Sequence, residues 1–395
     1  MGLLTSETKA FIREHADENP ETVALQSKRY PNLPMAFIAQ QVKARQHIQK
    51  KLPSWHANGD VVFPGSLSLE QCSSETAAAY KARLFEGESM ADLTGGLGVD
   101  AIAFSTHFKR VYHIERSAEL SAIVEENVEA FGKQTIVTTI AGDGIEWLDS
   151  HEGELDLVYV DPARRDGRSL KVSALADCEP NLTLVWERLL KRAKHVAVKL
   201  SPGLDIDSIV KELRGIREVH VISVANECKE TFCIAEDAYE GEAEIICVNE
   251  RASENWDRFS FLRSDEKALV GDFSECRRYL YEPNASIMKA GAFKTLGKKM
   301  GLLALHPRTR FYTSSELVDQ FPGRVFEILD TGEIRSKVAR ALFPEGKANT
   351  FARNAGLTSD ALKKKLKLGD GGDLFAIGTT DLSEQRLLLK CRRVL

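Results

Sequence analysis

The sequence predicts an α/β fold built on a doubly wound, mainly parallel sheet, and three observations support this prediction. Between about residue 88 and residue 250, short apolar runs alternate with stretches of helical period. The run that ends at Asp92 is followed by a glycine-rich turn and then by a helix start, over residues 92–104. The chain has 395 residues, of which 43% are hydrophobic and 28% charged, which suffices for a buried core and for more than one domain.

The N-terminal region, residues 1–85, is predicted to be helical. Apolar residues recur at helical spacing between Phe37 and Ile48, and Ser74 followed by Glu75 is typical of a helix start. The first residues lack the basic and apolar segments of a signal peptide, and no apolar run approaches the roughly 20 residues of a membrane helix. The seven cysteines are scattered without a CxxC pair. We therefore expect a cytoplasmic protein that does not span a membrane.

The central region, residues 86–250, alternates predicted strands with predicted helices. The strands are expected at 90–93, 110–114, 135–140, 155–160, 195–200, 218–224, 231–235 and 244–248. The helices are expected at 101–107, 119–131, 145–150, 182–193 and 206–213. Because no helix separates the last two strands, we expect them to form an antiparallel hairpin.

The C-terminal part is predicted to be a small α+β region that begins after a polar linker at 251–276. Proline and glycine pairs divide this region into two units, residues 277–321 and 322–395. The segments 277–310 and 335–368 each carry a net charge of +7, against −5 for the whole chain, so the remaining residues carry −19. Such an asymmetry is typical of a module that binds a polyanion, although solvated helix faces would give the same pattern.

Three acidic residues follow three successive predicted strands. These are Asp92 before the glycine turn, Glu115 and Asp143. The carboxyl ends of parallel strands lie at one edge of a sheet, so the three side chains should line one crevice. There Glu115 could accept hydrogen bonds from the two hydroxyls of a ribose, and Asp143 from an adenine amine. Residues 96–101 also fit G-x-G-x-x-A, so a nicotinamide dinucleotide remains possible on the residues alone.

A fourth motif, Asp161-Pro162-Ala163-Arg164, follows the apolar strand 155–160. A carboxylate at this edge lies where a second substrate would meet a bound cofactor. The side chain of Arg164 could stack on a base or bind phosphate.

This constellation resembles the class I S-adenosylmethionine-dependent methyltransferases over residues 88–250. The resemblance implies a Rossmann-like sheet of seven strands and S-adenosylmethionine as the cofactor. It further implies that Asp92 and the glycines hold the methionine part, that Glu115 holds the ribose, and that Asp143 holds the adenine. The candidate cofactor-binding residues are Asp92, Gly95, Gly96, Gly98, Asp100, Glu115, Asp143 and Gly144. The candidate catalytic residues are Asp161, Pro162 and Arg164.

The fourth motif is similar to the matching segments of RNA uracil-5 methyltransferases and, more loosely, of nucleic-acid amino-methyltransferases. Methylation of a pyrimidine carbon needs a cysteine nucleophile. The strand at 195–200 continues into Ser201-Pro202-Gly203 and supplies none. We therefore expect N-methylation, in which a carboxylate stabilises the positive charge that develops on an amine.

A second resemblance covers the whole chain. Residues 278–284, 289–293 and 366–372 look like those of a group of bacterial methyltransferases whose C-terminal part is ferredoxin-like and then THUMP-like. THUMP domains bind RNA in tRNA-modifying enzymes, so the resemblance implies tRNA or rRNA as the substrate. The candidate nucleic-acid-binding residues are Lys298, Lys299, Lys363, Lys364 and Lys365.

Three other interpretations remain open at this point. The enzyme could methylate a protein or a small molecule, it could be an NAD-dependent oxidoreductase, or the chain could bind RNA without catalysis. None of the nine histidines shows metal-ligand spacing, and we expect no metal.

Overall fold

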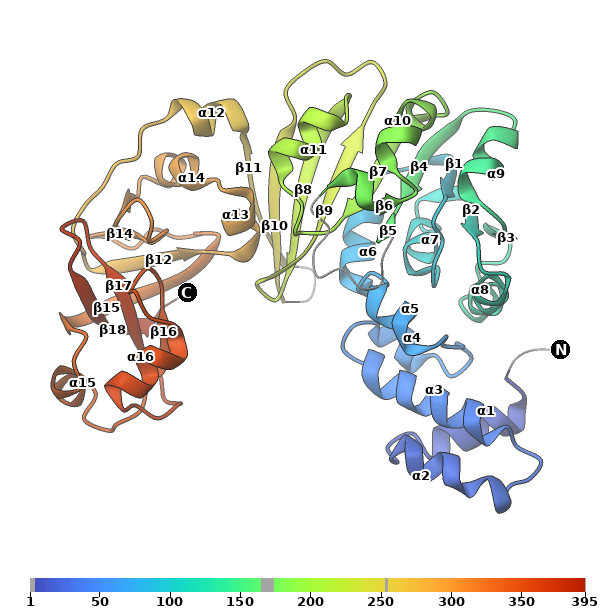
Figure 1. Cartoon of the computed structure of the whole chain (residues 1–395), viewed down its shortest axis with the longest axis horizontal. Coiled ribbons are helices and arrows are strands. Elements are labelled where there is room, and N and C mark those ends of the chain that lie inside the picture. The colour runs from blue at the N-terminus through green and yellow to red at the C-terminus, as the bar shows by residue number, and fades with distance from the viewer. Residues whose placement is uncertain (1–3, 165–173, 253–254, 395) are drawn as a thin grey trace. The chain divides into compact units, whose positions relative to one another are not determined.

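The computed structural model describes residues 4–164, 174–252 and 255–394, and it contains two compact units (Figure 1). The first unit comprises Met1–Glu218 and Glu230–Gly241, and the second comprises Val219–Lys229 and Glu242–Leu395. In the described ranges, no helix has the length and apolar character that crossing a membrane requires.

The first unit begins with helices, as predicted. They are α1 (Ser6–Glu14), α2 (Pro20–Leu25), α3 (Met35–Ile48), α4 (Pro53–Ala57), α5 (Ser66–Gln71) and α6 (Glu75–Ala82). Ser74 caps α6, because its hydroxyl accepts a hydrogen bond from the Ala77 amide at 3.2 Å. Phe11, Ile38 and Val42 form a buried cluster with Ile123 from a later helix, so the N-terminal helices pack directly on the α/β part of the unit.

The α/β part of the first unit confirms the predicted fold class. Its strands are β1 (Gly87–Asp92), β2 (Phe108–Glu115), β3 (Val137–Ala141), β4 (Leu155–Val160), β7 (Ala193–Leu200) and β9 (Glu227–Ala235), in the order β9-β7-β4-β1-β2-β3. The strands from β7 to β3 run parallel, and β9 is antiparallel to β7. The helices between them are α7 (Val99–Phe104), α8 (Ala118–Ala130), α9 (Gly144–Ser150), α10 (Leu182–Leu190) and α11 (Ile206–Glu212). A short pair, β5 (Ala163–Arg164) and β6 (Cys178–Glu179), lies outside this sheet.

The second unit holds strands β8 (Ile216–Val224), most of which belongs to it, β10 (Glu244–Ala252) and β11 (Asn255–Leu262), followed by α12 (Arg263–Ala268). With β8, the described chain has seven strands of five or more residues between positions 87 and 235, as the first resemblance implies. The predicted hairpin of 231–235 with 244–248 is wrong, because β9 pairs with β7 and β10 pairs with β11. Strand β11 lies in the segment expected to be a linker. The alternating residues Phe259 and Phe261 are buried there, and the polar residues around them conceal this strand in the sequence.

The rest of the second unit forms a seven-stranded mixed sheet with helices. The strands are β12 (Tyr279–Pro283), β13 (Leu303–Ala304), β14 (Tyr312–Ser314), β15 (Gly323–Glu333), β16 (Asn349–Ala352), β17 (Leu374–Thr380) and β18 (Arg386–Arg393), in the order β13-β14-β12-β15-β18-β17-β16. The helices are α13 (Ala285–Ala290), α14 (Phe293–Met300), α15 (Ser336–Leu342) and α16 (Ser359–Leu366). Because β12 pairs with β15, the two predicted C-terminal units share one sheet.

Candidate functional site

The glycine turn after β1 packs tightly against the end of β2. The Gly95 amide donates to the Ile114 carbonyl at 2.9 Å, and the Gly96 amide donates to Oε2 of Glu115 at 2.8 Å. A Cβ on Gly95 would lie 2.3 Å from Nε2 of the buried His113 ring. Gly98, at φ +80°, precedes α7 in the left-handed region that favours glycine. The predicted order of strand, turn and helix is therefore confirmed, and its glycines have steric reasons.

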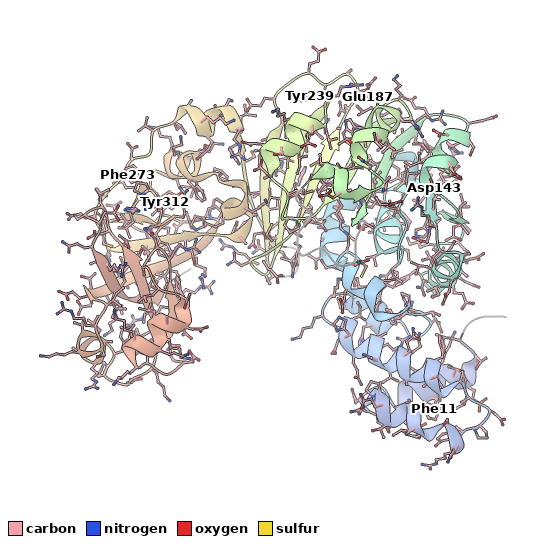
Figure 2. The ribbon with its side chains drawn as sticks, viewed as in Figure 1. Phe11, Asp143, Glu187, Tyr239, Phe273 and Tyr312 are labelled. Carbon is pink, nitrogen blue, oxygen red and sulfur yellow. The ribbon has the colours of Figure 1, made fainter. Side chains whose placement is uncertain are left out.

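The three acids predicted to share an edge lie at the ends of adjacent parallel strands. Asp92 ends β1 and Glu115 ends β2. Asp143 directly precedes α9 (Figure 2). Oε1 of Glu115 accepts from the Ser117 amide at 2.8 Å, and its other oxygen accepts from Gly96. Each carboxylate oxygen has two lone pairs, so Glu115 keeps acceptor capacity for a ligand.

Asp143 is engaged more fully. Its Oδ1 caps α9 by accepting from the Ile145 and Glu146 amides at 2.8 and 3.1 Å. Its Oδ2 accepts from Nε and Nη2 of Arg116 at 3.0 and 2.8 Å. Burial alone would raise the pKa of Asp143, but these hydrogen bonds outweigh it and lower the pKa. The adjacent Gly144 is also constrained, since a Cβ there would lie 2.1 Å from the Leu93 carbonyl oxygen.

The Asp92 carboxyl is almost completely buried, at 2% exposed. Burial raises its pKa well above the usual range, and the neighbouring carboxylates of Asp100, Asp161 and Glu115 add to the effect. Its Oδ1 accepts from the Thr94 amide at 3.1 Å. Mutual repulsion among acids marks this edge as a place where a cationic group would be stabilised.

The fourth motif lies beside the glycine turn. The Asp161 amide donates to Oγ1 of Thr94 at 2.6 Å, which connects the end of β4 to the turn after β1. The Asp161 carboxylate, 31% exposed, pairs with the ammonium of Lys199 at the end of β7. Pro162 follows and is half-buried. Arg164 ends β5, but its side chain lies outside the described residues.

These residues are connected to a buried network of charged side chains, which was not predicted from the sequence. Lys81 of α6 is 0% exposed, and its ammonium lies 2.9 Å from Oδ1 of Asp100 and 3.0 Å from Oε1 of Glu230. Ser73 joins the network by accepting from Lys81 at 2.9 Å and from Lys199 at 3.3 Å, and it donates to Oδ2 of Asp100 at 2.7 Å. Asp100, a candidate cofactor residue, thus has both carboxylate oxygens engaged inside the protein.

A sequence signal for this network did exist. Lys81 lies on the same helix face as the buried residues Ala77 and Ala78. Lys199 interrupts an apolar strand, and Glu230 directly precedes the apolar part of β9. A lysine or a glutamate in a buried stripe requires a partner of opposite charge. The sequence alone did not indicate which residue was the partner of which.

The second unit contains a cavity of about 640 Å³ around two arginines. The Arg324 and Arg353 guanidinium groups share one carboxylate, that of the buried Glu282, with Nε of Arg324 at 2.7 Å and Nη2 of Arg353 at 2.6 Å. Arg324 also lies over the Phe351 ring at 4.9 Å, and Phe375 lines the same cavity. The cavity thus offers one net positive charge from this triad together with aromatic surface.

The predicted lysines have different surroundings. Lys363 of α16 pairs with Asp370, a residue that lines the arginine cavity, and Lys364 and Lys365 beside it are exposed. On α14, Lys298 and Lys299 are exposed, and the ammonium of Lys299 donates to the Ser260 carbonyl at 2.7 Å. Lys363 is therefore connected to the lining of the arginine cavity through Asp370, whereas Lys299 is bonded to β11.

Three family models match separate parts of the chain. They describe an RNA cap guanine-N2 methyltransferase over residues 87–234, a ferredoxin-like domain over 279–322 and a THUMP-like domain over 323–393. The crystal structure of a proposed methyltransferase from Porphyromonas gingivalis W83 is 30% identical, with a TM-score of 0.90 and 100% coverage of both chains. In two strains of Mycobacterium tuberculosis, a protein described as an uncharacterised S-adenosylmethionine-dependent methyltransferase is 23% identical over 324 residues, which span 79% of this chain and 83% of that protein.

Proposed function

This chain belongs to the family of S-adenosylmethionine-dependent methyltransferases with ferredoxin-like and THUMP-like C-terminal domains, and we propose that it methylates a nitrogen atom of structured RNA, tRNA or rRNA. The methyl donor follows from the family. The choice of RNA as acceptor depends on one observation above all: the second unit has a cavity with two arginines, and Lys363 of α16 pairs with Asp370 in its lining.

The edge of the first sheet suits the donor. S-adenosylmethionine supplies a methyl group on a positively charged sulfur, and the repelling carboxylates around Asp92 favour a cation. In our proposal, Asp92 and the turn glycines Gly95, Gly96 and Gly98 hold the methionine part, and Glu115 binds the ribose hydroxyls. Asp143 and Gly144 line the adenine site, where Asp143 exchanges its bonds to Arg116 for the adenine amine. Asp100, near the start of α7, fixes the helix that follows the turn through its bonds to Lys81 and Ser73.

Asp161 is proposed to receive the acceptor. Its half-exposed carboxylate can accept a hydrogen bond from an exocyclic amine and stabilise the positive charge that develops during transfer. Alignment of donor and acceptor supplies most of the catalysis, because an amine is already nucleophilic. Pro162 fixes the backbone after the carboxylate. Arg164 is proposed to stack on the target base or to bind its phosphate.

Nitrogen is favoured over carbon by the state of the neighbouring cysteine. Methylation of a pyrimidine carbon requires a thiolate close to the acceptor. Cys178 in β6 is 4% exposed, and burial, together with Asp177 and Asp161, raises the pKa of its thiol. It would therefore remain protonated and poorly nucleophilic, while Lys199-Leu200-Ser201 at the end of β7 offers no thiol.

The second unit is proposed to bind the RNA. Guanidinium groups and aromatic rings bind phosphates and unpaired bases, and the lysines of α16 extend the positive surface beyond the cavity. Lys298 and Lys299 on α14 are proposed as a separate set of phosphate contacts. One net charge in a cavity gives little affinity alone, so RNA binding should depend on several such contacts and be sensitive to salt.

Methyl transfer to total RNA tests this proposal. The RNA comes from a strain that lacks the gene, so that its target sites are unmodified, and S-adenosylmethionine carries a tritiated methyl group. We expect ribonuclease-sensitive labelling that Asp161→Ala abolishes, while calorimetry shows S-adenosylhomocysteine binding unchanged. Labelling of a protein extract in a parallel reaction, with none of the RNA, would contradict RNA as the acceptor. Normal labelling by the Asp161→Ala variant would contradict the role of Asp161.

A further inference from the structure

We infer that Lys199 is a positioning residue for methyl transfer. Its ammonium group holds the carboxylate of Asp161 in one orientation. This inference rests on the proposed function of Asp161. The proposed role of Lys199 follows from its contacts in the first unit.

Asp161 is fixed at two points. Its amide donates to Oγ1 of Thr94 at 2.6 Å, and its Oδ2 pairs with the ammonium of Lys199. Lys199 is itself fixed, since the ammonium also donates to Oγ of Ser73 at 3.3 Å and the side chain is only 12% exposed. With Oδ2 held in this way, Oδ1 is the oxygen available to an incoming amine.

The charged side chains near Lys199 come from four parts of the first unit. Asp161 follows β4, Glu230 lies on β9, Asp100 on α7 and Lys81 on α6. Burial alone would lower the pKa of Lys199, but the carboxylates of Asp161, Glu230 and Asp100 raise it above the usual lysine range. Lys199 therefore stays an ammonium at any pH at which the enzyme works, and it acts by orientation and charge rather than by accepting a proton.

One consequence follows for the Asp161 carboxyl. Without Lys199, the carboxylate can rotate away from the acceptor, and a small misplacement of a catalytic group costs a large factor in rate. The loss should therefore appear in kcat and not in binding of the cofactor product, a separation that a purely structural lysine would not produce.

Kinetics with the full-length enzyme test this consequence. Lys199→Met should lower kcat by about 100-fold, as a misplaced catalytic group does, while binding of S-adenosylhomocysteine changes little. Lys199→Arg, which keeps a cation, should recover a large part of kcat. The control is Lys194→Met on the same strand, where an exposed lysine pairs with Asp156. Unchanged kcat in Lys199→Met would overturn the inference.

Carbon-13 NMR of aspartate-labelled enzyme bound to S-adenosylhomocysteine tests the contact between Lys199 and Asp161 without RNA. The Asp161 carboxyl signal is assigned by its loss in Asp161→Asn, and thermal unfolding verifies that each variant is folded. We expect the chemical shift of this signal to change in Lys199→Met, which removes the cation at Oδ2, and to stay near the wild-type value in Lys199→Arg. An unchanged signal in Lys199→Met would overturn the inference even if RNA were labelled normally. A wild-type enzyme that labels no RNA would contradict the proposed function and leave this signal as the test of Lys199.

Discussion

At the edge of the first sheet, Lys81 is 0% exposed and its partners Asp100 and Glu230 are 9% and 5% exposed, whereas Arg324 and Arg353 at the cavity of the second unit are 32% and 28% exposed. In the first unit, the buried ammonium of Lys81 has two carboxylate partners within the protein, as desolvation requires. In the second unit, two cations share one buried carboxylate and part of each stays in contact with water. The fully buried charges of the first unit therefore hold its geometry in place, whereas the partly exposed arginines of the second unit can also contact a ligand.

The largest expected effect concerns the buried charges around Lys81 in the first unit. Lys81→Met removes the cation between Asp100 and Glu230 and leaves two buried carboxylates without it. Breaking a buried pair in this way costs about 3–5 kcal/mol, because the remaining charge is uncompensated. Urea unfolding followed by circular dichroism measures the loss. Lys194→Met, which removes an exposed partner of Asp156, is the matched control and should change stability far less. Equal stability of the two variants would show that the network does not hold the site.

A smaller effect concerns the glycine turn above that network. In Gly95→Ala, the new Cβ meets the His113 ring at 2.3 Å, and this ring is completely buried. The turn must shift, so we expect S-adenosylhomocysteine affinity to fall by about 10-fold or more, roughly 1.4 kcal/mol. The control is Gly142→Ala, because that glycine has open space around it and lies directly before Asp143. Titration calorimetry should show wild-type affinity for the control, and wild-type affinity for Gly95→Ala would refute the steric argument.

The same contrast explains what the sequence could predict. Asp92, Glu115, Asp143 and Asp161 were identifiable because each follows an apolar run, and parallel strands bring their ends together. The partners in the network come from α6, α7, β7 and β9, and no local pattern states that Lys81 meets Glu230, 149 positions later in the chain. Strand β11 escaped prediction for a related reason, because its apolar residues are few and its pairing with β10 is what makes it a strand.

In the second unit, the sequence indicated the positive charge but not how the charged side chains are arranged around the cavity. The basic segments were visible by counting, yet the cavity depends on Glu282 from β12 meeting Arg324 of β15 and Arg353 after β16. The paired carboxylate reduces the free charge of the cavity, and no count of lysines and arginines reveals that pairing. The predicted boundary at residue 322 lies between two strands that pair in one sheet, β12 and β15.

The smallest expected effect concerns the lysines of α16 in the second unit. Replacing Lys363, Lys364 and Lys365 by glutamine should weaken RNA binding with little loss of stability, because Lys364 and Lys365 are exposed and a surface ion pair such as Lys363 with Asp370 contributes little to folding. Three lost phosphate contacts should reduce the slope of log affinity against log salt by about 2 for an unpaired strand. Fluorescence anisotropy with labelled total tRNA at several salt concentrations measures this slope. The control variant replaces the exposed Lys28, Lys43 and Lys50 of the N-terminal helical region, which changes the net charge equally. A similar fall in slope for both variants would mean that RNA responds to total charge alone, whereas a fall confined to the first would assign the contact to α16.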